Sequence, residues 1–210
     1  MALALLVNMM MGFQAWLGAT VVYTELNPYR ITIHMVMALL IVAVMLIIIA
    51  RANRETPPKV ETRRHQGFQI GLIAVLVLSI AQVILGTQVR EEIDMIGDQM
   101  GHTGRETWIE QLSGSFLVHR SFSIAVVLGN AFVIWLNRKA RLGMRLVNVV
   151  GVLIGMEVLT GIGMAYGGVP SWMQLTHLVF ASVLFGLQFY ILLDYRRRLK
   201  AGALHPPLAA

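Results

Sequence analysis

Long apolar stretches separated by short polar segments run along almost the whole chain. Six of these stretches are long enough to cross a hydrocarbon core, which needs about 20 helical residues. The predicted spans cover residues 2–24, 31–50, 68–89, 116–136, 146–166 and 172–193. The pattern predicts an all-α fold, a polytopic membrane bundle of six transmembrane helices. The first span lacks a preceding basic region and is too long for the apolar part of a signal peptide, so we do not expect a cleaved signal.

Composition and charge agree with this prediction. Of the 210 residues, 57% are hydrophobic and 13% are charged, which is typical of a membrane protein. Of 17 Lys and Arg residues, five lie in 51–67, four in 137–145 and four after 193. The positive-inside tendency places these segments and both termini in the cytoplasm, so we expect an integral protein of the inner (cytoplasmic) membrane. The net charge of +6 then reflects orientation in the lipid bilayer, and no nucleic-acid partner is expected. The absence of cysteine excludes disulfides, thiolate metal sites and cysteine nucleophiles.

A short element occurs three times along the chain and indicates an internal repeat. Each copy has Gln or Glu four residues before a Gly, and each is followed by a helix that carries a His. The three sets are Gln14, Gly18 and His34; Gln82, Gly86 and His119; and Glu157, Gly161 and His177. We infer a unit of four helices. Residues 68–193 form one complete unit, and residues 1–50 form the second half of another, which is incomplete at the N-terminus. Residues 51–67 are a basic loop and 194–210 a cytoplasmic tail.

The three histidines lie within the first few residues of helices that begin on the outer side, so all share one depth in the outer third of the membrane. An ionisable residue at this depth is costly and is a candidate functional residue. A neutral imidazole hydrogen-bonded to a neighbouring helix is the alternative for any single one. Three at equal depth on repeated elements favour a functional role.

The neighbours of these histidines fit a heme. A small residue follows each His one turn later, at Ala38, Ser123 and Ala181, and leaves room for a flat macrocycle. Zinc sites usually add carboxylate or thiolate ligands, whereas two facing imidazoles suit heme iron. Arginines at the outer helix ends are candidates to pair with heme propionates, although contact with lipid headgroups remains an alternative. These are Arg30, Arg90 and Arg120.

Glu157 is the one acid within a predicted span. Its alignment with Gln14 and Gln82 favours an interhelical hydrogen bond over proton transfer, because polar groups often join membrane helices. The three glycines of the element are expected to permit close helix approach.

The stretches "QAWLGATVV...NPYRITIHMVMALL", "QVILGTQVRE", "FLVHRSFS" and "LTGIGMAYGGVPSWMQLTHLVFASVLF" resemble the heme A synthase (CtaA-type) family of cytochrome oxidase assembly enzymes. The resemblance covers residues 8–193. It implies an oxidoreductase that converts heme O to heme A by oxidising a ring methyl to a formyl group. It further implies that His119 and His177 bind a b-type heme, with Arg120, Ser123 and Ala181 nearby. His34, Arg30 and Ala38 would contact the substrate heme.

The chain also departs from the family pattern. Family members have two four-helix halves with two His ligands each, and here the first two helices of the N-terminal half are missing. The second substrate-side His and the acidic residue to which catalysis is usually assigned are missing with them. No residue here replaces that acid, since position 116, one turn before His119, is Phe. No catalytic residue is therefore assigned, and the sequence leaves open whether the isolated chain is an active enzyme. It also leaves open whether the chain is truncated or a six-helix variant.

Two other classes of function remain as alternatives. A b-type cytochrome that carries electrons across the bilayer would normally place His pairs at two depths. A membrane scaffold or transporter would use the histidines only as hydrogen-bonding groups. If the chain is a heme A synthase, the expected partners are heme O and heme A. Heme O synthase, an electron donor, cytochrome oxidase assembly proteins or a second copy of the chain are further candidates.

Overall fold

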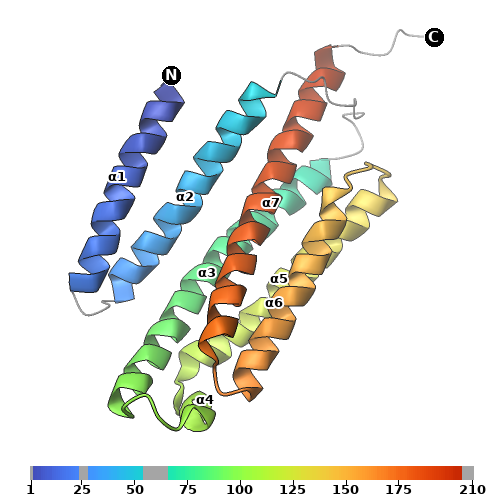
Figure 1. The fold of residues 1–210 in the computed structure, drawn as a ribbon. Helices are drawn as coiled ribbons and strands as arrows, with labels where there is room; N and C mark the ends of the chain where they lie inside the picture. Colours follow the sequence, from blue (N-terminus) through green and yellow to red (C-terminus); the bar gives the residue numbers. More distant parts are fainter. Residues whose placement is uncertain (1, 24–27, 54–65, 205–210) are drawn as a thin grey trace.

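The computed structural model describes residues 2–23, 28–53 and 66–204. Six long helices and one short helix account for most of this part of the chain (Figure 1). They are α1 (Ala2–Tyr23), α2 (Pro28–Ala52), α3 (Gln66–Gln99), α4 (Trp108–Gln111), α5 (Gly114–Lys139), α6 (Leu146–Tyr166) and α7 (Ser171–Leu204). A 3-10 turn, η2 (Arg105–Thr107), leads into α4. The six long helices are all apolar enough to cross a membrane, which confirms the predicted polytopic helical bundle.

Two helices run further than the sequence pattern predicted. α3 continues to Gln99 rather than ending near 89, because its buried stripe continues through Ile93 and Ile96 and Arg90 pairs with Asp94 at 2.9 Å one turn along. α7 continues beyond residue 193, where Arg198 pairs with Asp194 at 2.9 Å. The helix α3 therefore continues ten residues beyond the predicted span 68–89. A short helix, α4, lies in the segment that follows.

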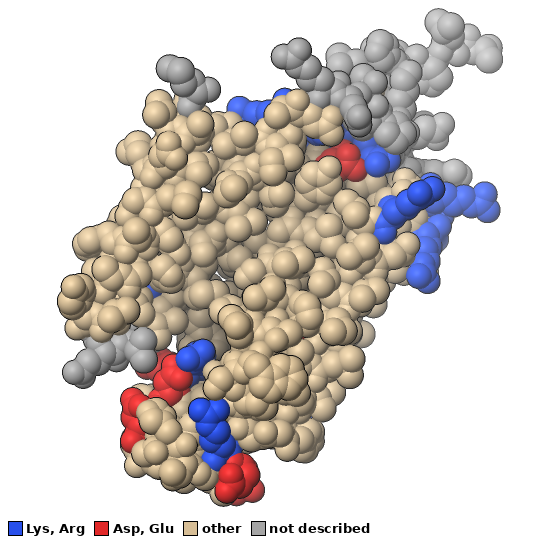
Figure 2. Space-filling view, in the orientation of Figure 1, with Lys and Arg blue, Asp and Glu red and all other residues tan. Residues whose placement is uncertain are grey.

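Most of the predicted basic loop, residues 54–65, lies outside the described residues, as does the end of the tail, residues 205–210. α1 begins and α7 ends at the end of the bundle where α5 joins α6 (Figure 1). Figure 2 shows Lys and Arg side chains gathered near that end, and most of the visible acidic side chains near α4 and the end of α3. We call the latter the outer end. Which end faces the cytoplasm stays a prediction.

The four helices α3, α5, α6 and α7 form a ring. α3 packs against α5, α5 against α6, α6 against α7, and α7 against α3. α2 packs on the outside of this ring against α7 and α3, and α1 packs mainly against α2. The predicted complete unit is thus a four-helix bundle, with the α1–α2 pair lying beside it (Figure 1).

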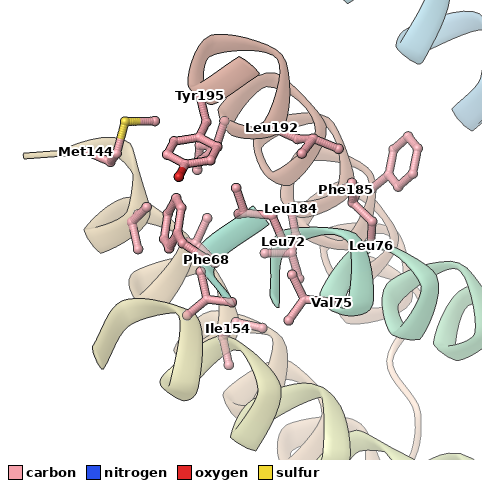
Figure 3. Packing of buried hydrophobic residues seen from close by; sticks show 14 of the residues in the cluster. Phe68, Leu72, Val75, Leu76, Met144, Ile154, Leu184, Phe185, Leu192 and Tyr195 are labelled. Carbon is pink, nitrogen blue, oxygen red and sulfur yellow. The ribbon is translucent and has the colours of Figure 1, made fainter. Parts of the chain in front are cut away.

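The core of the bundle is formed by the side chains of all four ring helices and α2. Near the basic end, the Phe68 ring packs edge-on against Tyr195, with 5.0 Å between ring centroids (Figure 3). A second apolar cluster lies at the outer end and joins the end of α3 to Trp108 and Val169. Arg105 stacks over the Trp108 ring at 5.0 Å and donates hydrogen bonds to the Val169 carbonyl and the Ser171 hydroxyl. The segment between α3 and α5 is thereby attached to the α6–α7 turn.

Candidate functional site

A buried hydrogen bond fixes α5 and α7 relative to each other. The side-chain amide of Gln188 donates to Oδ1 of Asn130 at 2.9 Å, and Ser79 donates to Oε1 of Gln188 at 2.9 Å. Asn130 lies eleven residues after His119, and Gln188 lies eleven residues after His177. Eleven residues are close to three helical turns, so each His shares a helix face with its amide and lies about 16 Å toward the outer end. His119 and His177 therefore have the same depth and face the same space inside the bundle.

The order of the helices in the ring sets the separation of α5 and α7, which carry these two histidines. α5 and α7 lie diagonally across the four-helix unit, since each packs against both α3 and α6. Neighbouring helices are about 8–10 Å apart, so a diagonal pair is separated by roughly 11–14 Å. Facing side chains on diagonal helices are the usual source of cofactor ligands inside four-helix bundles.

The first two copies of the repeat form the same contact between Gln and His. Nε2 of Gln14 lies 3.3 Å from Nε2 of His34 and donates to the His34 carbonyl at 3.1 Å. Nε2 of Gln82 lies 3.4 Å from Nε2 of His119 and donates to the His119 carbonyl at 3.1 Å. The Gln of the repeat thus holds both the ring and the backbone of the His on the next helix of its pair.

The third copy forms a different contact. Oε2 of Glu157 lies 2.8 Å from Nδ1 of His177, so the interhelical contact predicted for Glu157 is present. The Thr160 hydroxyl lies 2.9 Å from the same ring nitrogen. In this copy the nitrogen left for a metal is Nε2, because Nδ1 is occupied by the carboxylate.

The glycines of the repeat face the histidine rings. A Cβ atom added to Gly18 would lie 3.2 Å from Cε1 of His34, and one added to Gly86 would lie 3.2 Å from Cε1 of His119. At Gly161 the corresponding distance to His177 is 3.8 Å. The close approach predicted from the sequence is therefore an approach of an imidazole to a helix backbone.

Several buried polar atoms at these contacts have no hydrogen-bond partner. They include Nδ1 of both His34 and His119, the amide oxygens of Gln14 and Gln82, and Oε1 of Glu157. Buried polar groups without partners are uncommon, and each calls for an explanation such as a ligand. The Nδ1 atoms of His34 and His119 lie beside the glycines of their repeats, and Nε2 of each ring faces a Gln amide. A metal on His119 would therefore take Nε2 in place of the Gln82 amide, and a metal on His177 would take Nε2 because Nδ1 faces Glu157. As residue types, the two imidazoles fit heme iron, whose ligands are commonly histidines.

The remaining sequence-predicted residues lie near these histidines along their own helices. Ala38, Ser123 and Ala181 are half-buried, one turn beyond each His. The Ser123 hydroxyl donates to the Arg120 carbonyl at 2.6 Å, so its proton is already used. Arg30 is half-buried, whereas Arg120 is exposed. The roles assigned to these residues stay predictions.

His34 is linked to the His119 site through α3. The hydroxyl oxygens of Thr32 and Thr87 are 2.7 Å apart. The Thr87 proton is donated to the Ile84 carbonyl at 2.7 Å, so Thr32 is the donor of this bond. Thr32 precedes His34 by two residues, and Thr87 follows the glycine that contacts His119. The Gln14–His34 pair is thus docked beside the Gln82–His119 pair.

A cavity of about 310 Å³ opens at the outer end of the bundle, close to His177 along α7. Arg90 and Arg105 supply its cationic groups, and Gln174 and Leu178 line it from α7. Sequence reasoning missed Arg105, although an arginine three residues before a tryptophan in an otherwise acidic outer segment was a usable signal. The carboxylates of Asp94 and Asp98 line the same cavity, which reaches Leu178, the residue after His177.

The fold and the site define a polytopic membrane protein with a histidine pair at the outer end of a four-helix unit. The chain belongs to the family of cytochrome oxidase assembly proteins (COX15-CtaA), whose model matches residues 1–189. The family predicted from the sequence is thereby confirmed. Comparison with curated proteins gave no match, and comparison with solved structures gave none either.

Proposed function

We propose that the protein acts in the conversion of heme O to heme A and binds a b-type heme between His119 and His177. The observation that carries this proposal is the diagonal arrangement of two histidines at equal depth, each eleven residues from a member of one buried hydrogen bond. Membership in a family of cytochrome oxidase assembly proteins supports it, because heme A is a cofactor of that oxidase.

The chain would hold the b-type heme through its own side chains. His119 and His177 would hold the heme iron, and Gln82 and Glu157 contact their rings. Arg105 lines the outer cavity and is the candidate to pair with a carboxylate that reaches the aqueous edge, whereas Arg90 already pairs with Asp94. A bound heme supplies one-electron redox chemistry, while the protein controls ligand geometry and surroundings.

In the same proposal His34 contacts the substrate heme, with Arg30 and Ala38 on the same helix. Gln14 holds His34 as Gln82 holds His119, and Thr32 fixes α2 beside α3. Two heme sites side by side at one depth permit electron transfer between them. Heme O, heme A and an electron donor are the partners that this role requires. The proposed location is the inner membrane, with both termini in the cytoplasm.

The optical spectrum of the purified protein tests the b-type heme site. We expect the wild-type chain, produced with ample heme, to show the sharp reduced bands of a bis-histidine heme. His119→Ala and His177→Ala are each expected to lower heme content at least tenfold. His34→Ala is expected to leave these bands in place, because the His34 ring contacts Gln14 and is not part of the His119–His177 pair.

Ser182→Ala is the control. The Ser182 hydroxyl on α7 donates to the Leu178 carbonyl of its own helix, so its removal should leave heme content unchanged. All variants should elute as the wild type does in gel filtration. Full heme content in both His119→Ala and His177→Ala would refute the proposed site, and a wild type without heme would favour a scaffold or transporter.

A further inference from the structure

The three copies of the repeat differ in charge at one position. Gln14 and Gln82 are neutral amides, whereas the corresponding residue of the third copy is Glu157. Each holds the histidine of its own helix pair. The His119–His177 pair is therefore unequal, since an amide contacts one ring and a carboxylate contacts the other.

The surroundings of His177 determine which ring nitrogen carries a proton. The Thr160 hydroxyl donates to the Met156 carbonyl at 2.8 Å and lies 3.0 Å from the Glu157 carbonyl, so its oxygen is left to accept from His177. Nδ1 of His177 thus faces two acceptors, the Thr160 oxygen at 2.9 Å and the Glu157 carboxylate at 2.8 Å. This arrangement places the proton on Nδ1 and the lone pair on Nε2.

The contact is largely shielded from solvent. The Glu157 side chain is 14% exposed and the His177 side chain 25% exposed, and Oε1 of Glu157 is buried without a partner. A carboxylate that accepts the outer N–H of a metal-bound imidazole fixes the ring orientation and makes the ring a stronger electron donor. His119 has no such contact, because its neighbour Gln82 presents an amide N–H to the ring.

We propose that Glu157 is a positioning residue that makes His177 the stronger of the two axial ligands and lowers the reduction potential of the bound heme. This inference rests on the proposed heme site. The physical reason is that extra negative charge on an axial ligand stabilises ferric iron more than ferrous iron. The negative charge of the Glu157 carboxylate thus contributes to the reduction potential of this heme.

Exchange of the carboxylate and the amide tests the inference. Glu157→Gln gives the third copy the same side chain as the other two, and Gln82→Glu places a carboxylate beside His119. Each is made in the full chain, and the bound heme is titrated with redox mediators while its low-spin EPR signals are recorded. We expect Glu157→Gln to keep its heme and shift the midpoint potential to more positive values, with changed EPR g-values. Gln82→Glu should shift the potential the other way.

The outcomes separate this inference from the proposed function. An unchanged potential and unchanged g-values in Glu157→Gln at full heme content would overturn the role of Glu157 and leave the heme site intact. A wild type that takes up no heme would refute the heme site and this inference together. If Glu157→Gln does not accumulate in cells, the Gln82→Glu variant is the test. An unchanged midpoint potential of the heme bound to that variant overturns the inference. A structural role alone would alter stability without shifting the potential.

Discussion

The side-chain amide of Gln188 donates to Oδ1 of Asn130 at 2.9 Å, and each residue lies eleven positions after a candidate heme ligand. Both side chains are almost fully buried, at 1% and 2% exposure. The bond joins two helices that lie diagonally in the four-helix unit, where direct packing is weak. It is therefore well placed to set the relative height of His119 and His177.

Gln188→Met is predicted to destabilise the bundle and weaken heme retention. The substitution nearly preserves the side-chain volume. It leaves the Ser79 hydroxyl and the side-chain oxygen Oδ1 of Asn130 without their hydrogen-bond partner. We expect a cost of about 1–2 kcal/mol, seen as a fall of roughly 2–8 °C in the thermal midpoint in detergent. Ser182→Ala is the control, since its hydroxyl bonds only the Leu178 carbonyl of the same helix. An unchanged midpoint in Gln188→Met would show that the bond does not stabilise the bundle.

Gly86→Ala is predicted to weaken binding of the proposed b-type heme. The new methyl group would lie 3.2 Å from Cε1 of His119, so the ring must shift by a few tenths of an ångström. A cost of about 1 kcal/mol corresponds to a roughly fivefold loss of heme affinity. Gly161→Ala should have less effect, because its methyl group would lie 3.8 Å from His177. Gly155 has open space on the same helix, so Gly155→Ala should bind heme as the wild type does. Equal affinities in all three variants would contradict the geometry.

Cysteine cross-linking is predicted to capture the contact between α2 and α3. The chain has no cysteine of its own, so Thr32→Cys combined with Thr87→Cys introduces a single pair. The hydroxyl oxygens of the native residues are 2.7 Å apart, which places their Cβ atoms near the separation that a disulfide needs. Mild oxidation should give a cross-linked band of altered mobility on a non-reducing gel. Thr32→Cys with Thr176→Cys, on α7, should remain reduced. No cross-link in the first pair would mean that the Gln14–His34 pair is not docked on α3 as described.

Hydropathy alone was sufficient to locate the six spans, because each long apolar run must be buried in lipid or protein. It could not locate the end of α3, where the pattern becomes polar but the buried positions Ile93 and Ile96 continue. Helix length there depends on contact with Trp108 from a segment further along the chain. Such tertiary contacts are not visible in the local pattern.

The repeat correctly predicted that Gln14, Gln82 and Glu157 correspond to one another, but it did not predict that their partners would be the histidines. That pairing depends on how each helix is rotated against the next. The Asn130–Gln188 bond was missed although its signal was present, since a buried amide follows each of two histidines by the same eleven residues. In the first copy the equivalent position is Met45, which is 47% exposed, so the signal is confined to the complete unit.

The contacts of Arg105 were missed for a different reason. Its segment turns through left-handed backbone at His102 and Gly104, and it bonds Val169, which is also left-handed. Glycine is the residue whose presence in a sequence indicates this conformation. His102 and Val169 are not glycines, so there was no local signal in the sequence at these two positions. The arginines chosen from the sequence were those at helix ends, and Arg120 among them is exposed.

The Asn130–Gln188 bond also gives the diagonal helices a pivot. The histidines lie about 16 Å from it along their helices, so a tilt of α7 by only 5° about that point would displace the His177 ring by about 1.4 Å. A small change in the angle between α5 and α7 at this bond would therefore produce a large change in the distance between the two imidazoles.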